Sequence, residues 1–126
     1  MTYSPSLSLV SVLVVSAGVL TACSTGESPR EAQVDLREFA VEVSSSRLAA
    51  GSVNLTVENI GEFAHTLVIS HEDGTVIAGT QLVAPGESTT LATSLPVGVL
   101  SFTCRIVTEV GDGALVDHYE RGMAAT

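Results

Sequence analysis

The chain has 126 residues, 45% of them apolar and 15% charged, which is too apolar for a disordered protein and too short for more than one compact domain. Five Arg and no Lys stand against fourteen Asp and Glu, so the formal net charge is −9. A chain without a basic cluster lacks the electrostatic footprint of a DNA- or RNA-binding protein, and we expect no nucleic-acid partner. No G-x-x-x-x-G-K loop is present, which excludes the P-loop nucleotide hydrolases.

The first 22 residues are predicted to be a signal peptide. Residues 7–20, LSLVSVLVVSAGVL, are apolar and uncharged, and they are too few for a helix that crosses a bilayer of about 30 Å. Residues 20–23, LTAC, resemble the bacterial lipobox, in which the signal is cleaved before a Cys that is then acylated. This resemblance implies an exported lipoprotein, anchored through Cys23 to the extracytoplasmic face of the membrane. The alternative is a plain secretory signal in which Cys23 is an ordinary thiol.

Residues 23–32 are rich in Ser, Gly, Pro and Glu, and almost nothing in this segment can be buried. Such a composition predicts a flexible tether. We expect one folded domain, residues 33–126, to follow the tether. All fourteen acidic residues lie beyond the signal, so the exported chain keeps its acidic balance.

The rest of the chain has the pattern of β-strands. Along residues 53–58, VNLTVE, apolar and polar residues alternate with the period of a half-buried strand. In the first strand the apolar positions change parity between Leu36 and Phe39, which predicts a β-bulge near Arg37 and Glu38. Short strands separated by turns, with no amphipathic helix, predict an all-β fold, an antiparallel sandwich or barrel. Further strands are expected at residues 65–69, 75–78, 88–95 and 97–104.

Strand parity places a thiol and an imidazole at one end of this fold. Cys104 continues the apolar face of residues 100–104, so its thiol should point into the core. By the same count His65 shares a face with Leu67. If Cys23 is acylated, Cys104 is a lone thiol in an oxidising compartment and has no disulfide partner. Its alternative role is that of a small buried hydrophobic residue.

A third element contains a second imidazole, that of His118, and five residues later a thioether, that of Met123. Together the three elements resemble the cupredoxins, the blue copper proteins, over residues 33–126, and this resemblance implies an all-β antiparallel Greek-key β-sandwich. The resemblance implies a type 1 copper site in which His65 and His118 are the nitrogen ligands. Cys104 would be the thiolate ligand and Met123 the weak axial ligand. The matching motifs are Asn59-x-Gly61-x-x-x-His65, Phe102-x-Cys104 and His118-x-x-x-Gly122-Met123.

The resemblance also implies a function. Soft sulfur ligands favour Cu(I) and imidazole also suits Cu(II), so one such site serves both oxidation states. We therefore expect one-electron transfer with a redox partner protein at the outer face of the membrane, and no enzymatic activity. Two alternatives stay open: a copper-handling or copper-sequestering lipoprotein that holds Cu(I) for delivery, and a metal-free cupredoxin-like interaction domain.

Thirteen residues separate Cys104 from His118, whereas small cupredoxins have only a few residues between these ligands. The insert consists of two short strand-like segments around Gly111-Asp112-Gly113, which predicts a β-hairpin with a three-residue loop. Val110 then lies opposite Ala114. This register places Cys104 and His118 on the same face, within reach of one metal ion.

The hairpin is expected to project beside the metal and to cover the edge of His118. Its apolar residues predict a docking surface for the partner, and packing onto the sandwich is the alternative. The chain ends three residues after Met123, which is too short for a closing strand of ordinary length. His71 lies in a turn sequence and is expected to face solvent.

Overall fold

A computed structural model describes residues 26–126 of the chain. Within this range no helix is long and apolar enough to cross a membrane. The described residues form ten strands: β1 (Glu31–Arg37), β2 (Ala40–Val43), β3 (Gly51–Asn59), β4 (Val68–His71), β5 (Val76–Gly79), β6 (Ser88–Leu95), β7 (Leu100–Thr103), β8 (Val107–Val110), β9 (Ala114–Asp117) and β10 (Ala124–Ala125).

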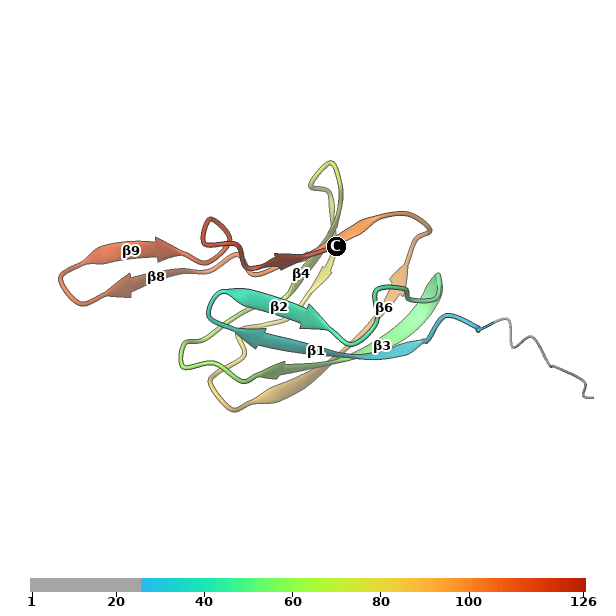
Figure 1. The fold of residues 1–126 in the computed structure, drawn as a ribbon, viewed down its shortest axis with the longest axis horizontal. Coiled ribbons are helices and arrows are strands. Elements are labelled where there is room, and N and C mark those ends of the chain that lie inside the picture. Colours follow the sequence, from blue (N-terminus) through green and yellow to red (C-terminus); the bar gives the residue numbers. More distant parts are fainter. Residues whose placement is uncertain (1–25) are drawn as a thin grey trace, which may run out of the picture.

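Two four-stranded sheets face each other as the layers of a sandwich (Figure 1). Their strand orders are β2-β1-β3-β6 and β10-β7-β4-β5, and β8 and β9 pair separately as a hairpin. The expected all-β sandwich is therefore confirmed. All pairs are antiparallel except β1 and β3, which run parallel, so the first sheet is mixed rather than wholly antiparallel.

The core lies between the two sheets. Val53, Leu55 and Val57 of β3 are buried, as the alternation along this strand predicts, while the polar residues between them face solvent. Ile69 and Phe102 approach from the second sheet and belong to the same apolar cluster. Each fully buried side chain of this size contributes about 1.5–3 kcal/mol, so burial of this cluster stabilises the packing of the two sheets against each other.

The predicted bulge near Arg37 and Glu38 is wrong, because the chain reverses its direction there. β1 and β2 are two antiparallel strands, and Arg37 is paired with Ala40 across a tight turn. The change of apolar parity after Leu36 reflects this reversal rather than an extra residue in one strand. The consequence for the site is that Glu38 lies at the tip of a hairpin.

The ordered domain begins slightly earlier than expected. β1 starts at Glu31, two residues before the predicted boundary, and the Arg30 side chain donates hydrogen bonds of 3.2 Å to the carbonyl oxygens of Ala50 and Ser52. The last two residues of the predicted tether, residues 31 and 32, therefore belong to β1. The signal peptide and the lipidation site at Cys23 lie outside the described residues.

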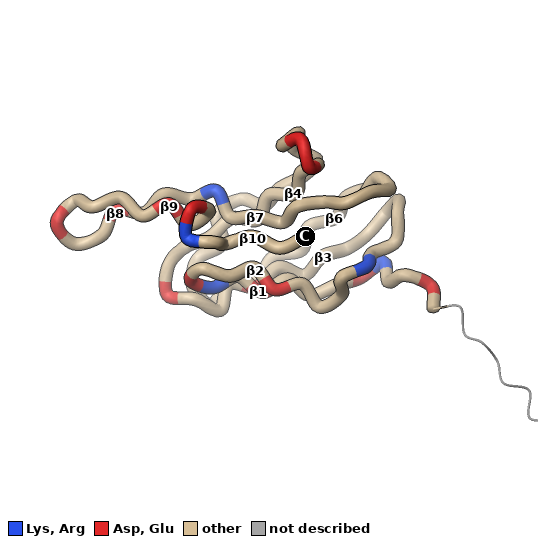
Figure 2. The backbone as a smooth tube through the Cα atoms, turned by 45° about the horizontal axis from the view of Figure 1, so that its top comes forward, with Lys and Arg blue, Asp and Glu red and all other residues tan. Residues whose placement is uncertain are grey.

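The insert forms the predicted hairpin with the predicted register, since Val110 pairs with Ala114 across the turn 111–113. Two glycines of the turn, Gly111 and Gly113, have positive φ angles of 54° and 91°, which glycine adopts without strain. The hairpin projects from one end of the sandwich (Figure 1), and its turn carries one acidic residue, Asp112 (Figure 2). At the C-terminus the short β10 pairs with β7 and completes the second sheet with only two residues.

Candidate metal centre

Three buried ligand residues meet at the end of the sandwich from which the hairpin projects. His65 precedes β4, Cys104 follows β7 directly, and His118 follows β9. Their exposed fractions are 0%, 0% and 1%. One nitrogen of each imidazole and the Cys104 sulfur all lie within 4.8 Å of one another. The structure thus brings together three of the four predicted metal ligands from three separate segments of the chain.

The distances between the donor atoms fit one metal ion. The Cys104 Sγ atom lies 3.8 Å from Nδ1 of His65 and 3.9 Å from Nδ1 of His118. Bonds of about 2.0 Å to nitrogen and about 2.3 Å to sulfur, arranged in a plane, separate N from S by about 3.7 Å. The two Nδ1 atoms lie 3.1 Å apart, which corresponds to an N–metal–N angle of about 100° at the same bond lengths. The donor set, two imidazoles and a thiolate, is that of a type 1 copper site.

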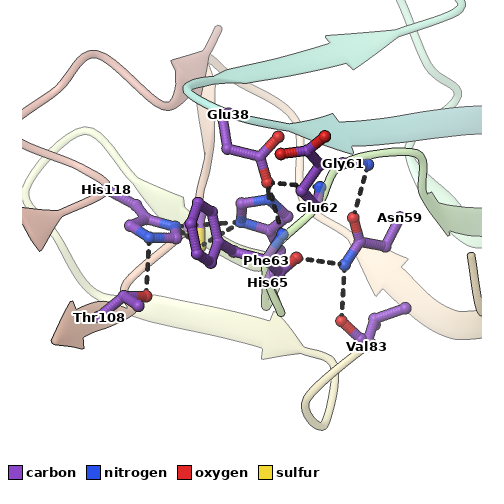
Figure 3. Close-up of polar contacts among 10 residues, drawn as sticks. Glu38, Asn59, Gly61, Glu62, Phe63, His65, Val83, Thr108 and His118 are labelled. Atoms are coloured by element: carbon purple, nitrogen blue, oxygen red, sulfur yellow. Dashed lines mark hydrogen bonds and ion pairs between the residues drawn. The ribbon is translucent and has the colours of Figure 1, made fainter. Parts of the chain in front are cut away.

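The outer nitrogen of each imidazole has its own partner (Figure 3). Nε2 of His65 lies 3.0 Å from a carboxylate oxygen of Glu38, and Nε2 of His118 lies 2.9 Å from the Thr108 hydroxyl. A carboxylate can only accept, so His65 donates from Nε2 and keeps the lone pair of Nδ1 for the centre. Such outer contacts fix the tautomer and orientation of metal-binding imidazoles.

Burial and neighbouring groups favour a neutral His118 imidazole and an ionised Glu38 carboxylate. Burial lowers the pKa of His118, and the nearby His65 lowers it further, which favours the neutral imidazole that binds metals. Partial burial alone raises the pKa of Glu38, but hydrogen bonds from Phe63, from its own backbone, from His65 and from Glu62 outweigh that effect and leave the pKa below its ordinary value. Glu38 is therefore a carboxylate.

The first sequence motif, Asn59-x-Gly61-x-x-x-His65, forms a clamp around the loop that leads to His65. The Asn59 side chain donates to the carbonyl oxygens of Phe63 and Val83 at 2.8 and 2.9 Å, and its own oxygen accepts from the Gly61 N–H at 2.9 Å. Asn59 is completely buried. His65 itself exchanges two backbone hydrogen bonds with Val83, of 3.1 and 2.8 Å, and these fix its place ahead of β4.

Gly61 has a separate role. A Cβ atom at this position would lie 2.5 Å from a carboxylate oxygen of Glu38, closer than real Cβ contacts come. A glycine at position 61 therefore lets the Glu38 carboxylate approach the loop and reach His65.

Met123, the predicted axial ligand, is held next to Cys104 and His118 by backbone hydrogen bonds. Its carbonyl oxygen accepts from the Cys104 N–H at 3.2 Å, and its N–H donates to the His118 carbonyl at 3.1 Å. The side chain is fully buried in the same apolar cluster as Cys104. These contacts tie Met123 to two of the other ligand residues, and axial ligation by its thioether stays a prediction. His71, by contrast, ends β4 with a partly exposed side chain and does not belong to the cluster of ligand atoms.

Three residues of the site escaped the sequence analysis: Glu38, Phe39 and Thr108. The Phe39 ring packs edge-on against the His118 ring, with centroids 5.4 Å apart. A turn brings Glu38 and Phe39 to the metal end, and its only local trace in the sequence is the change in parity ahead of Phe39, which a one-residue bulge would also produce. Thr108 could have been found from the hairpin register, because Thr108 and His118 are diagonal neighbours on one face of the hairpin.

Comparisons with known proteins support the fold. No family model matches the chain, and no curated protein matches it. Among solved structures, sodium-dithionite-reduced auracyanin from the photosynthetic bacterium Roseiflexus castenholzii is similar, with a TM-score of 0.61 and 20% sequence identity. The match covers 78% of this chain and 94% of the auracyanin chain. Auracyanin is a cupredoxin, so the chain has the cupredoxin fold.

Proposed function

We propose that this protein binds one copper ion at the centre formed by His65, Cys104 and His118, and that it carries single electrons. The observation that carries the proposal is the convergence of two Nδ1 atoms and one Sγ atom at distances that fit one ion. Bound copper would supply a one-electron couple between Cu(I) and Cu(II). Thiolate and imidazole ligands together suit both of these states.

The chain contributes by holding the donor atoms still. Both imidazoles are fixed from outside, His65 by Glu38 and His118 by Thr108. The ligand residues are buried, so water has little access to the donor atoms. Donors that keep their positions need little rearrangement when the charge of a bound ion changes, and this favours fast electron transfer. We propose Met123 as the weak axial ligand that tunes the reduction potential.

The same geometry favours an electron carrier over a protein that delivers copper. Delivery needs a ligand that can be exposed and exchanged, and here the three ligand residues are almost fully buried. The insert between Cys104 and His118 is an ordered hairpin, and its Thr108 contacts His118 directly. These contacts support a retained ion.

The location and the partner are further parts of the proposal. We propose that lipidation of Cys23 anchors the protein on the extracytoplasmic face of the membrane, where it meets a redox partner protein. The hairpin offers exposed apolar side chains for such a contact, with Val107 at 52% and Leu115 at 72% exposure.

A copper titration tests the function. Adding Cu(II) to the apo protein should produce a strong visible charge-transfer band with an end point at one equivalent. The band should be absent in Cys104→Ser and unchanged in Cys23→Ser, the matched control at the other cysteine of the chain. Voltammetry should then show rapid, reversible oxidation and reduction. A colourless wild-type protein would refute the copper site, and tight Cu(I) binding with irreversible oxidation would favour copper delivery instead.

A further inference from the structure

Glu38 makes an unusual concentration of contacts beside the metal centre. One oxygen of its carboxylate accepts three hydrogen bonds: from the N–H of Glu62 at 2.9 Å, from the N–H of Phe63 at 2.8 Å, and from Nε2 of His65 at 3.0 Å (Figure 3). This oxygen links the turn between β1 and β2 to the loop that carries His65. The carboxylate therefore orients the loop and the imidazole at the same time.

The surroundings are built for this carboxylate. The loop approaches it at Gly61, where a Cβ would collide with it, and the buried Asn59 side chain holds the same loop through hydrogen bonds at Gly61 and Phe63. The Glu38 side chain is 23% exposed, and the His65 side chain is fully buried. The contact is thus shielded from much of the solvent, which strengthens its electrostatic effect relative to a surface pair.

The two imidazoles of the centre differ in their outer partners. His65 donates to a negatively charged carboxylate, whereas His118 meets the neutral hydroxyl of Thr108. A carboxylate partner raises the electron-donating power of the imidazole that it contacts. A negative charge next to the site also stabilises a doubly charged ion more than a singly charged one.

We propose that Glu38 is a positioning residue that orients His65 toward the metal and whose negative charge favours Cu(II) over Cu(I). This inference rests on the proposed copper function and deepens it. It assigns the Glu38–His65 pair as a determinant of the reduction potential, separate from the axial ligand. The Asn59, Gly61 and His65 motif then has a physical meaning, since it builds the pocket that receives this carboxylate.

Glu38→Gln separates the charge from the geometry. The amide oxygen of Gln can accept the same three hydrogen bonds, so the orientation of His65 should survive while the charge is lost. Changes to the outer partners of metal-binding residues alter metal affinity by about 10- to 100-fold, and here the change is limited to the charge, so we expect an effect at the lower end of this range that falls on Cu(II). A tenfold selective loss of Cu(II) affinity corresponds to an increase of about 59 mV in the potential of a one-electron couple. Voltammetry of the copper-loaded variant should therefore show a higher potential than that of wild type.

Glu62→Gln is the matched control. It removes the same charge from the neighbouring loop, where the side chain is exposed and the backbone alone contacts Glu38. Its potential should stay close to the wild-type value. Equal potentials for Glu38→Gln and Glu62→Gln would overturn the role of the Glu38 charge.

The orientation of His65 is tested without copper. Nitrogen NMR of the apo protein should show His65 protonated at Nε2 in wild type and in Glu38→Gln, and a mixture of tautomers in Glu38→Ala. A wild-type tautomer in Glu38→Ala would overturn the positioning role. A wild-type protein that forms no copper site would overturn the proposed function and with it the effect on potential, whereas the ring tautomer would still decide the positioning role.

Discussion

Asn59 is the residue on which the loop before His65 depends, and its replacement gives a sharp stability test. Asn59→Ala removes three side-chain hydrogen bonds, to the carbonyl oxygens of Phe63 and Val83 and from the Gly61 N–H. Each contributes about 0.5–1.5 kcal/mol, so the free energy of unfolding should fall by about 3 kcal/mol. For a domain of this size, 1 kcal/mol shifts Tm by about 4–8 °C, which gives a decrease of about 12 °C or more.

Thermal unfolding of the apo protein, followed by circular dichroism, measures this decrease without any dependence on copper. Asn54→Ala is the matched control, because Asn54 lies on the same strand, β3, with its side chain exposed to solvent. Surface substitutions of this kind change stability by less than about 0.5 kcal/mol. Asn59→Asp should be at least as damaging as Asn59→Ala, since a carboxylate oxygen would replace the donor that faces two carbonyl oxygens. Equal Tm values for Asn59→Ala and Asn54→Ala would refute the claim that the hydrogen bonds of the Asn59 side chain stabilise the loop before His65.

Two further substitutions test the contacts of His118 and the fourth ligand. Thr108→Val keeps the shape of the side chain but leaves the buried Nε2 of His118 without its partner, which should cost about 1–3 kcal/mol of unfolding free energy, while Thr108→Ser should stay near wild type. Equal chemical denaturation curves for these two variants would show that the hydroxyl has no role. Met123→Leu conserves core volume at a cost below about 1.5 kcal/mol, so the copper-loaded variant should keep its visible band and show a raised reduction potential. A potential equal to the wild-type value would remove Met123 from the ligand set.

Much of the frame of the site follows from local rules. Residues 53–57 alternate because successive strand residues point to opposite faces, and the structure buries the apolar set. The same rule placed the Cys104 thiol inward. The hairpin register followed from a glycine-rich turn, whose backbone conformation suits Gly111 and Gly113. In these cases, neighbours in the sequence carried enough information.

The reversal between β1 and β2 could not be predicted in this way. A one-residue bulge and a tight turn both shift the parity of the apolar positions, and Arg37-Glu38-Phe39-Ala40 contains none of the usual turn residues. Because a bulge was predicted in place of the turn, the contact between Glu38 and His65 was not predicted: the turn is what brings Glu38 to the metal end of the sandwich. The parallel pairing of β1 with β3 escaped prediction for a related reason: it depends on which strands meet in space.

The outer partners of the imidazoles depend on contacts between distant segments. Glu38 and His65 are 27 residues apart, and nothing in the spacing of the ligands indicates that they meet. Acidic residues scattered over an acidic chain are typical of a solvated surface. A ligand pattern therefore predicts which atoms bind the metal, while the residues that orient those atoms become visible only when the strand ends are placed together.

The long insert between Cys104 and His118 need not make the centre loose. His118 is fixed at the base of the hairpin, where its N–H donates to the Ile106 carbonyl at 3.0 Å. Met123 connects His118 to Cys104, because its backbone makes one hydrogen bond with each of them. The residues of the insert pair with each other as a hairpin, so the two ends of the insert, next to Cys104 and His118, lie close together as they would in a short loop. Thr108 of the insert also contacts His118, so the insert itself supplies one of the contacts that hold this imidazole in place.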